Sequence, residues 1–387
     1  MATLAVTQIV GHGVLYYAFA VLLTPMQTDL HASTAQLAGA LTASVLVSAL
    51  AAPLVGRWLD ARGGRGLMTF GAALGAGMVL VWSQVTTLAQ LYAVLVVVGI
   101  ATAMVLYEAA FAIVVAWSAP ARRAKALLAI TVVAGFASSV FLPLTGLLVE
   151  ELGWREALMV LGVAYGLLAV PLHALVLPRH AGPVSAPRAR RGEAVRRALR
   201  EWAFWMLAGA FVVQTGATAV VGVLLVTYLI ALGHKPIFAA VVAGLLGVLS
   251  VTGRLISTAL ASRWSVASIT ASIFALQGAA ALALPLAGRY PAGAVGAVTL
   301  FGLGFGVATI ARPALLAERY GTTAYGSVSG ALALPVIVAK ACAPLLAATL
   351  VPAIGYSRVM AGVALACTLA GLVLAAYHRL LFRSGSN

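Results

Sequence analysis

The chain has 387 residues, of which 63% are hydrophobic and only 9% are charged, and it carries a formal net charge of +15. A soluble domain has about 25% charged residues, so this composition excludes an ordinary water-soluble protein. Runs of about 20 apolar residues recur along the whole length, as expected of helices that cross a bilayer. The sequence therefore predicts an all-α membrane protein.

Twelve segments have the length and hydrophobicity of membrane spans. The first begins near Leu4 and is too long, and too weakly flanked by charge, for a cleaved signal peptide, so we count it as a span. We expect helices over residues 5–29, 36–58, 67–85, 88–116, 126–149, 156–177, 202–230, 237–261, 267–287, 292–317, 325–349 and 357–378.

The longest connection, residues 178–201, divides these spans into two sets of six. It is rich in Pro, Ala and Arg. We expect either a solvated tether or, in its second half, a basic amphipathic helix on the membrane surface with Ala194 and Leu199 on one side. The predicted domains are an N-terminal six-helix bundle (1–177), this cytoplasmic basic linker, and a C-terminal six-helix bundle (202–387).

The placement of positive charge predicts the topology. Of the 24 Lys and Arg residues, 17 fall in one set of alternating connections and the C-terminal tail, four in the opposite connections, and three inside hydrophobic segments. This bias follows the positive-inside rule, so we expect the inner (cytoplasmic) membrane with both termini in the cytoplasm. The basic loops then face anionic lipids rather than nucleic acid. Cys342 and Cys367 lie in apolar segments, so no disulfide is expected.

A basic motif follows the second expected helix. It reads Gly56-Arg57-Trp58-Leu59-Asp60-Ala61-Arg62-Gly63-Gly64-Arg65. This segment resembles the loop signature G-x-L-x-D-R-x-G-R of the major facilitator superfamily, although Trp58 replaces the usual Leu and the Arg after Asp is displaced to Arg62. The resemblance implies a transporter of two pseudo-symmetric six-helix bundles. It also implies a conformational latch at the loop residues Gly56, Asp60, Arg62, Gly63 and Arg65, in which Asp60 receives Arg charge and a neighbouring helix N-terminus.

Within the superfamily, the chain is most similar to the monocarboxylate and oxalate–formate exchanger branch, over nearly its whole length. The residues that carry this similarity are Tyr16-Tyr17 with Phe19, Gly153-Trp154-Arg155, Val226-Thr227-Tyr228-Leu229 and Gly253-Arg254. The Gly-Pro-rich motif of drug–proton antiporters is only partly present, because Pro143 and Gly146 remain but two of its glycines are missing. The similarity implies transport of a small organic anion.

Two cations inside expected spans are candidates for binding that anion. A charge near the bilayer centre costs about 2.5–3.5 kcal/mol on insertion scales, so such a residue faces protein or a wet passage. By the family resemblance, Arg254 binds the substrate carboxylate, and its paired donors match a planar carboxylate. Lys340 lies midway along the eleventh span, and a helix 8 Arg with a helix 11 Lys is similar to the oxalate–formate exchanger. Structural packing of Arg254 and snorkelling of Lys340 are the alternatives.

Two further charges, Glu108 in the fourth span and Arg312 in the tenth, occupy related positions of the two halves. Aligning Gly99 with Gly302 brings Glu108 within one residue of Arg312. Three roles remain open: an ion pair that gates the cytoplasmic side, proton coupling through Glu108, or direct contact with substrate.

The first span presents Gln8, His12 and Tyr16 at intervals of four, so they share one helix face. We expect this face to contribute to the substrate site, with His12 either protonating to couple transport to pH or remaining a buried, hydrogen-bonded residue. Tyr228 is a candidate hydroxyl donor to substrate, or a packing residue.

The sequence carries no nucleotide loop, zincin motif or nucleophile elbow, so we expect no enzyme, cofactor or metal site. We predict a monomeric secondary transporter of a mono- or dicarboxylate, as an exchanger or with protons as a coupling partner. The alternatives are an efflux pump of the same superfamily, for a drug, a metabolite or an arsenical-type oxyanion, and more remotely an intramembrane enzyme or receptor.

Overall fold

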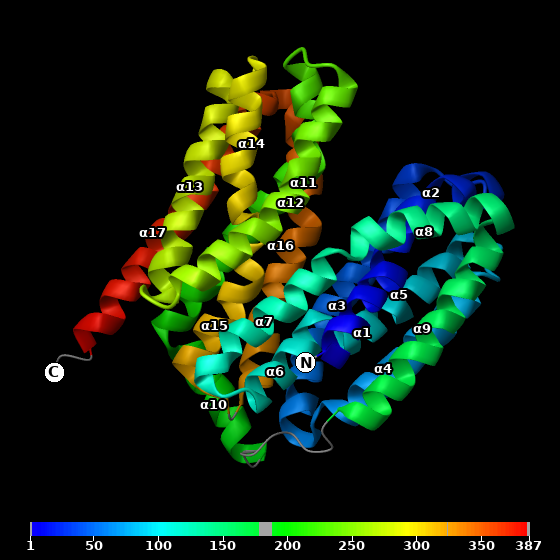
Figure 1. The fold of residues 1–387 in the computed structure, drawn as a ribbon, viewed down its shortest axis with the longest axis horizontal. Coiled ribbons are helices and arrows are strands. Elements are labelled where there is room, and N and C mark those ends of the chain that lie inside the picture. Colours follow the sequence, from blue (N-terminus) through cyan, green and yellow to red (C-terminus); the bar gives the residue numbers. More distant parts are fainter. Residues whose placement is uncertain (1, 178–187, 323, 385–387) are drawn as a thin grey trace. The chain divides into compact units, whose positions relative to one another are not determined.

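The computed structural model describes residues 2–177, 188–322 and 324–384, and they form helices joined by short connections (Figure 1). The elements are α1 (Ala2–His12), η1 (Gly13–Tyr17), α2 (Ala18–Asp29), α3 (Thr34–Arg62), α4 (Gly64–Trp82), α5 (Leu88–Val105), α6 (Tyr107–Trp117), α7 (Pro120–Gly135), α8 (Ala137–Leu152), α9 (Trp154–Val176), α10 (Arg188–Arg200), α11 (Trp202–Ala231), α12 (Pro236–Leu260), α13 (Val266–Ala287), α14 (Pro291–Phe305), α15 (Val307–Tyr320), α16 (Tyr325–Ile354) and α17 (Tyr356–Ser384). Twelve helical segments among these residues are long and apolar enough to cross a membrane. The predicted all-α fold with twelve spans is confirmed.

Local sequence sets the helix ends. Ser33 caps α3, and its side chain and that of Gln36 form a reciprocal capping box, which satisfies two backbone N–H groups that the first turn leaves open. At its other end α3 runs to Arg62 and stops at Gly63, whose φ of 79° favours glycine. The motif residues Asp60 and Arg62 therefore lie in the last helical turn. The sequence placed them in a loop, but no residue from 57 to 62 breaks a helix.

Several spans are broken in mid-course. A π-helical turn, η1, interrupts the first span. In the fourth span, Leu106 adopts an extended ψ of −159° between α5 and α6. Phe136 separates α7 from α8, and Gly306 separates α14 from α15. At two of these breaks a side chain from another helix donates to a main-chain carbonyl, from Gln8 to Val105 and from Arg254 to Gly306.

The chain forms two compact units. One contains residues 1–195 with 320–334, and the other contains residues 196–319 with 335–387. In the first unit α3 packs against α5, and α4 packs against α5 and α9. In the second, α13 packs against α14 and α17, and α12 against α14. The bundle and linker boundaries predicted from the sequence stay a prediction, and residues 178–187 of that linker lie outside the described residues.

The second half of the linker is a helix, α10, rather than a tether. Its buried side is formed by Ala198, with Ala194 and Val195 half-buried. Ala194 and Ala198 are one turn apart and share a face, as spacing by four requires. Leu199, which the sequence placed on that face, is exposed because it is rotated about 100° from Ala198.

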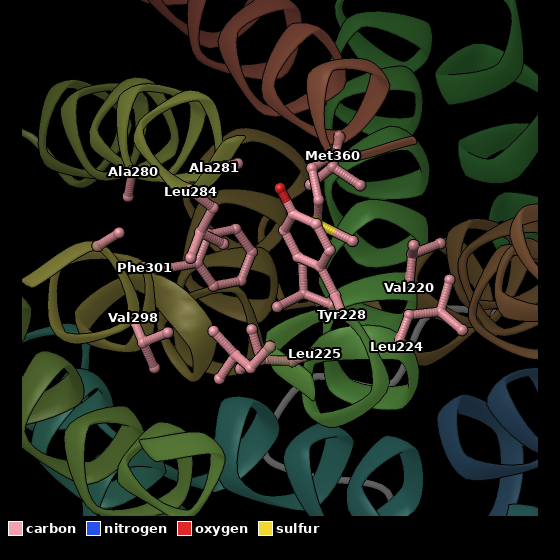
Figure 2. Close-up of a cluster of buried hydrophobic side chains, with 14 of the residues drawn as sticks. Val220, Leu224, Leu225, Tyr228, Ala280, Ala281, Leu284, Val298, Phe301 and Met360 are labelled. Atoms are coloured by element: carbon pink, nitrogen blue, oxygen red, sulfur yellow. The ribbon is translucent and has the colours of Figure 1, made fainter. Parts of the chain in front are cut away.

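A large apolar cluster fills the core of the second unit (Figure 2). It gathers side chains from α11, α13, α14 and α17, among them Leu225, Leu284, Phe301 and Met360. Tyr228 belongs to this cluster and is almost fully buried. The cluster therefore fixes the helices that carry the polar groups described below.

Candidate functional site

In the first unit, Asp60 caps the N-terminus of α16. Its two carboxylate oxygens accept hydrogen bonds from the backbone N–H groups of Gly326, at 2.8 Å, and Ser327, at 2.6 Å. These N–H groups belong to the first turn of α16, where no carbonyl of the same helix can reach them. The positive end of the helix dipole also favours the Asp60 carboxylate. Of the two partners expected for Asp60, a helix N-terminus is therefore present.

Glycines allow the two backbones to approach closely around this contact. A Cβ on Gly56 would collide with the carbonyl oxygen of Gly326, and one on Gly330 would come within 2.5 Å of the carbonyl oxygen of Ala52. Gly326 and Gly330 are one turn apart on α16, so both face α3. Gly56 is thus needed for this close approach. Of the motif's cations, Arg62 lies 4.3 Å over the ring of Trp58, and Arg65 is half-buried.

Glu108 lies in the first turn of α6, just after the Leu106 break. It is half-buried, and the hydroxyl of Ser329 donates to its Oε2 over 3.5 Å. Ser329 is three residues from Gly326 and so belongs to the same end of α16 as the Asp60 contact. The structure thus brings Glu108 and Asp60 to one short stretch of α16.

The face of α1 predicted from the spacing of Gln8, His12 and Tyr16 meets the same break. The Gln8 amide donates to the carbonyl of Val105 over 2.6 Å, and Gln8 is fully buried. The His12 ring packs against the ring of Tyr107, with ring centroids 4.4 Å apart. Its Nδ1 lies 2.8 Å from the Gln8 carbonyl oxygen. Gln8 and His12 therefore support the broken fourth span. Tyr16 lies in η1 and packs edge-on against Tyr17.

In the second unit, Arg254 is bonded to the other broken span. Its Nε donates to the carbonyl oxygen of Gly306 over 3.1 Å, and only 8% of the residue is exposed. The same carbonyl accepts the Thr309 hydroxyl at 2.6 Å. A Cβ on Gly306 would collide with Arg254 Nε and Ser250 Oγ. Arg254 is thus oriented by the junction of α14 and α15.

Sequence reasoning missed a buried pair of amides beside this junction. Gln214 of α11 donates to Gln277 Oε1 over 3.1 Å, and Gln277 of α13 donates to the carbonyl of Phe301 over 3.2 Å. Both glutamines are almost fully buried. The sequence could have indicated this pair, because two glutamines lie deep in apolar spans. A buried amide is costly unless it is hydrogen-bonded, so each needs a partner there.

Among the remaining predicted residues, Tyr228 lies away from Arg254. Tyr228 lies in the apolar cluster, its hydroxyl 3.4 Å from Ser357 Oγ and its ring stacked on Tyr356. Since Arg254 is about 27 Å along α12 from the end that adjoins α11, Tyr228 is not its neighbour. Lys340 is exposed in the middle of α16, and Arg312 is half-buried in α15.

A second missed group ties three helix ends together in the first unit. Arg155, at the start of α9, pairs with Asp29 over 2.6 Å and donates to the carbonyl of Ser83 over 2.7 Å. Its guanidinium also lies 4.3 Å over the ring of Trp154. The sequence marked Gly153-Trp154-Arg155 only as a resemblance, because residues so distant in the chain give no sign of meeting.

One comparison with known proteins shows the family, and another shows the fold. The profile of the Major Facilitator Superfamily matches residues 5–335. No curated protein matches the chain by sequence. Among solved structures, the human organic anion transporter TETRAN is similar at 18% identity, with a TM-score of 0.73 over 96% of this chain and 99% of that chain. The fucose:proton symporter of E. coli is similar at 16% identity, with a TM-score of 0.75 over 97% and 98%. A bacterial homologue of the iron transporter ferroportin is similar at 14% identity, with a TM-score of 0.80 over 97% and 98%.

Twelve helical segments of the described chain that are long and apolar enough to cross a membrane define a multi-pass membrane protein, and the solved structures above share its fold. The profile match covers most of the chain, and it shows the family directly: the chain belongs to the Major Facilitator Superfamily. At identities below 20%, the solved structures support the fold and leave the substrate open.

Proposed function

We propose that the chain is a secondary active transporter of a small organic anion, a mono- or dicarboxylate, that works by alternating access in the inner membrane. The observation that carries this proposal is Arg254, a guanidinium buried inside a membrane span and oriented through Nε by the Gly306 carbonyl. A charge at this depth is costly and marks a functional site. We place the substrate carboxylate at Arg254.

The chemistry of the guanidinium favours a carboxylate. Its planar fork presents paired N–H donors that match two carboxylate oxygens, and such charge-assisted pairs are stronger than neutral hydrogen bonds. With Nε directed to Gly306, the edge formed by the two terminal nitrogens is the one through which an anion would bind. Lys340 supports the same assignment, since an exposed lysine in mid-span belongs in a wet passage, and a second cation attracts anions further.

Similar folds carry different substrates. One of them is described as an organic anion transporter and another as a fucose:proton symporter. They support transport through this fold without selecting the substrate, so the anion assignment depends on Arg254 and Lys340. The contact of Asp60 with α16 supports a latch that closes one side of the transporter, the cytoplasmic side in the topology proposed from the charge distribution.

Counterflow in proteoliposomes, with a panel of mono- and dicarboxylates, tests the proposal. We expect saturable exchange of at least one carboxylate by the native protein and its loss in Arg254→Ala, with partial recovery in Arg254→Lys. Arg263→Ala is the matched control, because Arg263 follows the same helix but is exposed beyond its end. An unchanged rate in Arg254→Ala would remove Arg254 from the site. Accumulation of cationic or neutral drugs in everted vesicles, with no carboxylate counterflow, would favour the efflux alternative.

The coupling mode follows from the same assay at several pH values. A proton-coupled symporter should show pH-dependent net uptake that Glu108→Gln flattens, whereas an exchanger should be insensitive to that change. Glu108 is the residue to test, because it lies beside the break in the fourth span and accepts a hydrogen bond from Ser329 of α16.

A further inference from the structure

Tryptophan is distributed unevenly between the two ends of the spans. Five of the seven tryptophans adjoin even-numbered connections, and all five are exposed: Trp58 at 42%, Trp117 at 44%, Trp202 at 73%, Trp205 at 53% and Trp264 at 63%. The other two, Trp82 and Trp154, adjoin odd-numbered connections and are buried at 1% and 7%. Twelve helical segments among the described residues are long and apolar enough to cross a membrane, and connections of even number between such consecutive spans share one side. Only that side presents tryptophan.

Exposed arginines accompany these tryptophans. Arg57 and Arg62 flank Trp58, Arg122 follows Trp117, and Arg263 precedes Trp264; all four arginines are exposed. Tryptophan prefers the level of the lipid headgroups, so the arginines beside it lie at that level too. This face therefore combines interfacial aromatic groups with positive charge.

The combination is densest where α10 meets α11. Arg196, Arg197 and Arg200 are exposed on the last turns of α10, while Ala198 between them is buried. The indole N–H of Trp205 donates to the carbonyl of Leu199 over 2.8 Å. This bond ties the end of the basic helix to the first turn of a membrane span.

Just beyond these arginines, Glu201 pairs with Arg319 at 3.0 Å. The negative charge of Glu201, which lies between Arg200 and Trp202, is therefore paired with Arg319. The three exposed arginines and the two exposed tryptophans lie within residues 196–205, which we call the α10–α11 junction.

We propose that the α10–α11 junction binds the headgroups of anionic phospholipids in the surrounding bilayer. A soluble acidic protein would also suit three arginines, but it would gain little from Trp202 and Trp205, which belong to the first turn of a membrane-spanning helix. Lipid satisfies both parts of the surface, since phosphate meets guanidinium and the glycerol region meets indole. The proposal is independent of the transported substrate.

Quenching of tryptophan fluorescence by brominated lipids tests the proposal on the full-length protein. The purified chain is placed in phosphatidylcholine vesicles with an equal, small fraction of brominated phosphatidylglycerol or brominated phosphatidylcholine. We expect the anionic lipid to quench more strongly, because each arginine at the headgroups enriches it about fivefold. Trp202→Phe with Trp205→Phe identifies the share of the signal that comes from the junction.

The decisive comparison uses two triple variants of equal charge in the same unit. Arg196→Gln, Arg197→Gln and Arg200→Gln should abolish the excess quenching at the junction. Lys235→Gln, Arg289→Gln and Arg358→Gln remove three exposed cations from odd-numbered connections and should leave it unchanged. Both should remain monodisperse, since all six side chains are exposed.

Three outcomes would overturn the proposal. The two brominated lipids quench the native protein equally, or the junction triple keeps its preference, or the control triple loses it as fully as the junction triple. Binding of polyglutamate by the same arginines, without any lipid preference, would assign the surface to an acidic protein instead.

Discussion

The Asp60 carboxylate shows how one side chain can close a contact between segments 266 residues apart. It satisfies two N–H groups that α16 leaves open at its start. Its geometry is demanding, because the backbones approach so closely that Gly56 and Gly326 admit no Cβ without a shift. Mutation of Asp60 therefore tests how much this contact stabilises the protein.

We expect Asp60→Ala to destabilise the protein by about 2 kcal/mol, since hydrogen bonds to a charged group are worth about 1.5–3 kcal/mol and the two N–H groups lose their acceptor. Thermal unfolding of the purified protein measures the loss. Asp29→Ala is the control, because the Asp29 side chain is 44% exposed and its pair with Arg155 should contribute about 1 kcal/mol or less. Equal losses in the two variants would contradict the importance of the α16 contact.

The sequence identified Asp60, Arg254 and Glu108 as polar residues that needed an explanation, but it gave a partner only for Asp60, a helix N-terminus, and only through the resemblance to the superfamily loop. The partners of Asp60 and Arg254 are backbone groups, the N–H groups of α16 and the carbonyl of Gly306. Backbone groups carry no signature in a sequence. An ion pair between Glu108 and Arg312, one of the three roles that the sequence left open for them, remains a prediction.

At the scale of whole elements, hydropathy located every span, with ends close to those observed. The helix over 202–230 begins and ends within one residue of α11 (Trp202–Ala231). The breaks were missed, because Leu106 and Phe136 are ordinary apolar residues in apolar surroundings. At Leu106 the break is stabilised by Gln8 from another helix, so it depends on tertiary contacts rather than local propensity.

The junction of α14 and α15 gives an element-scale prediction. Gly306→Ala should displace Arg254 and cost about 1–3 kcal/mol through overpacking, because the new Cβ meets Arg254 Nε and Ser250 Oγ. Gly296→Ala, in the same span, meets nothing within 4 Å and should be neutral or stabilising by up to about 1 kcal/mol. Thermal unfolding and carboxylate counterflow should both separate the two variants. A Gly306→Ala protein with native stability and transport would show that Arg254 does not depend on this junction.

At the scale of the whole molecule, the topology is open to direct measurement. The charge bias predicts that the even-numbered connections face the cytoplasm. With Cys342 and Cys367 replaced by alanine, an impermeant maleimide should label Tyr290→Cys in intact cells and should label Ser262→Cys only after lysis; both positions are exposed. The reverse pattern would place both termini outside and invert the proposed latch.

Two of the broken spans, the fourth and the tenth, share a feature that bears on how the chain is made. The side chain that supports each break precedes it in the sequence: Gln8 comes before Val105, while Arg254 and Gln277 come before the Phe301–Gly306 segment. During translation, the fourth and the tenth spans therefore leave the ribosome after the helices that carry their hydrogen-bond donors have been synthesised. The carbonyl groups at these two breaks can be hydrogen-bonded as soon as their spans enter the bilayer, because the donor helices are already present. Rearranging the gene so that the first span is translated last would remove this protection for the Leu106 break alone.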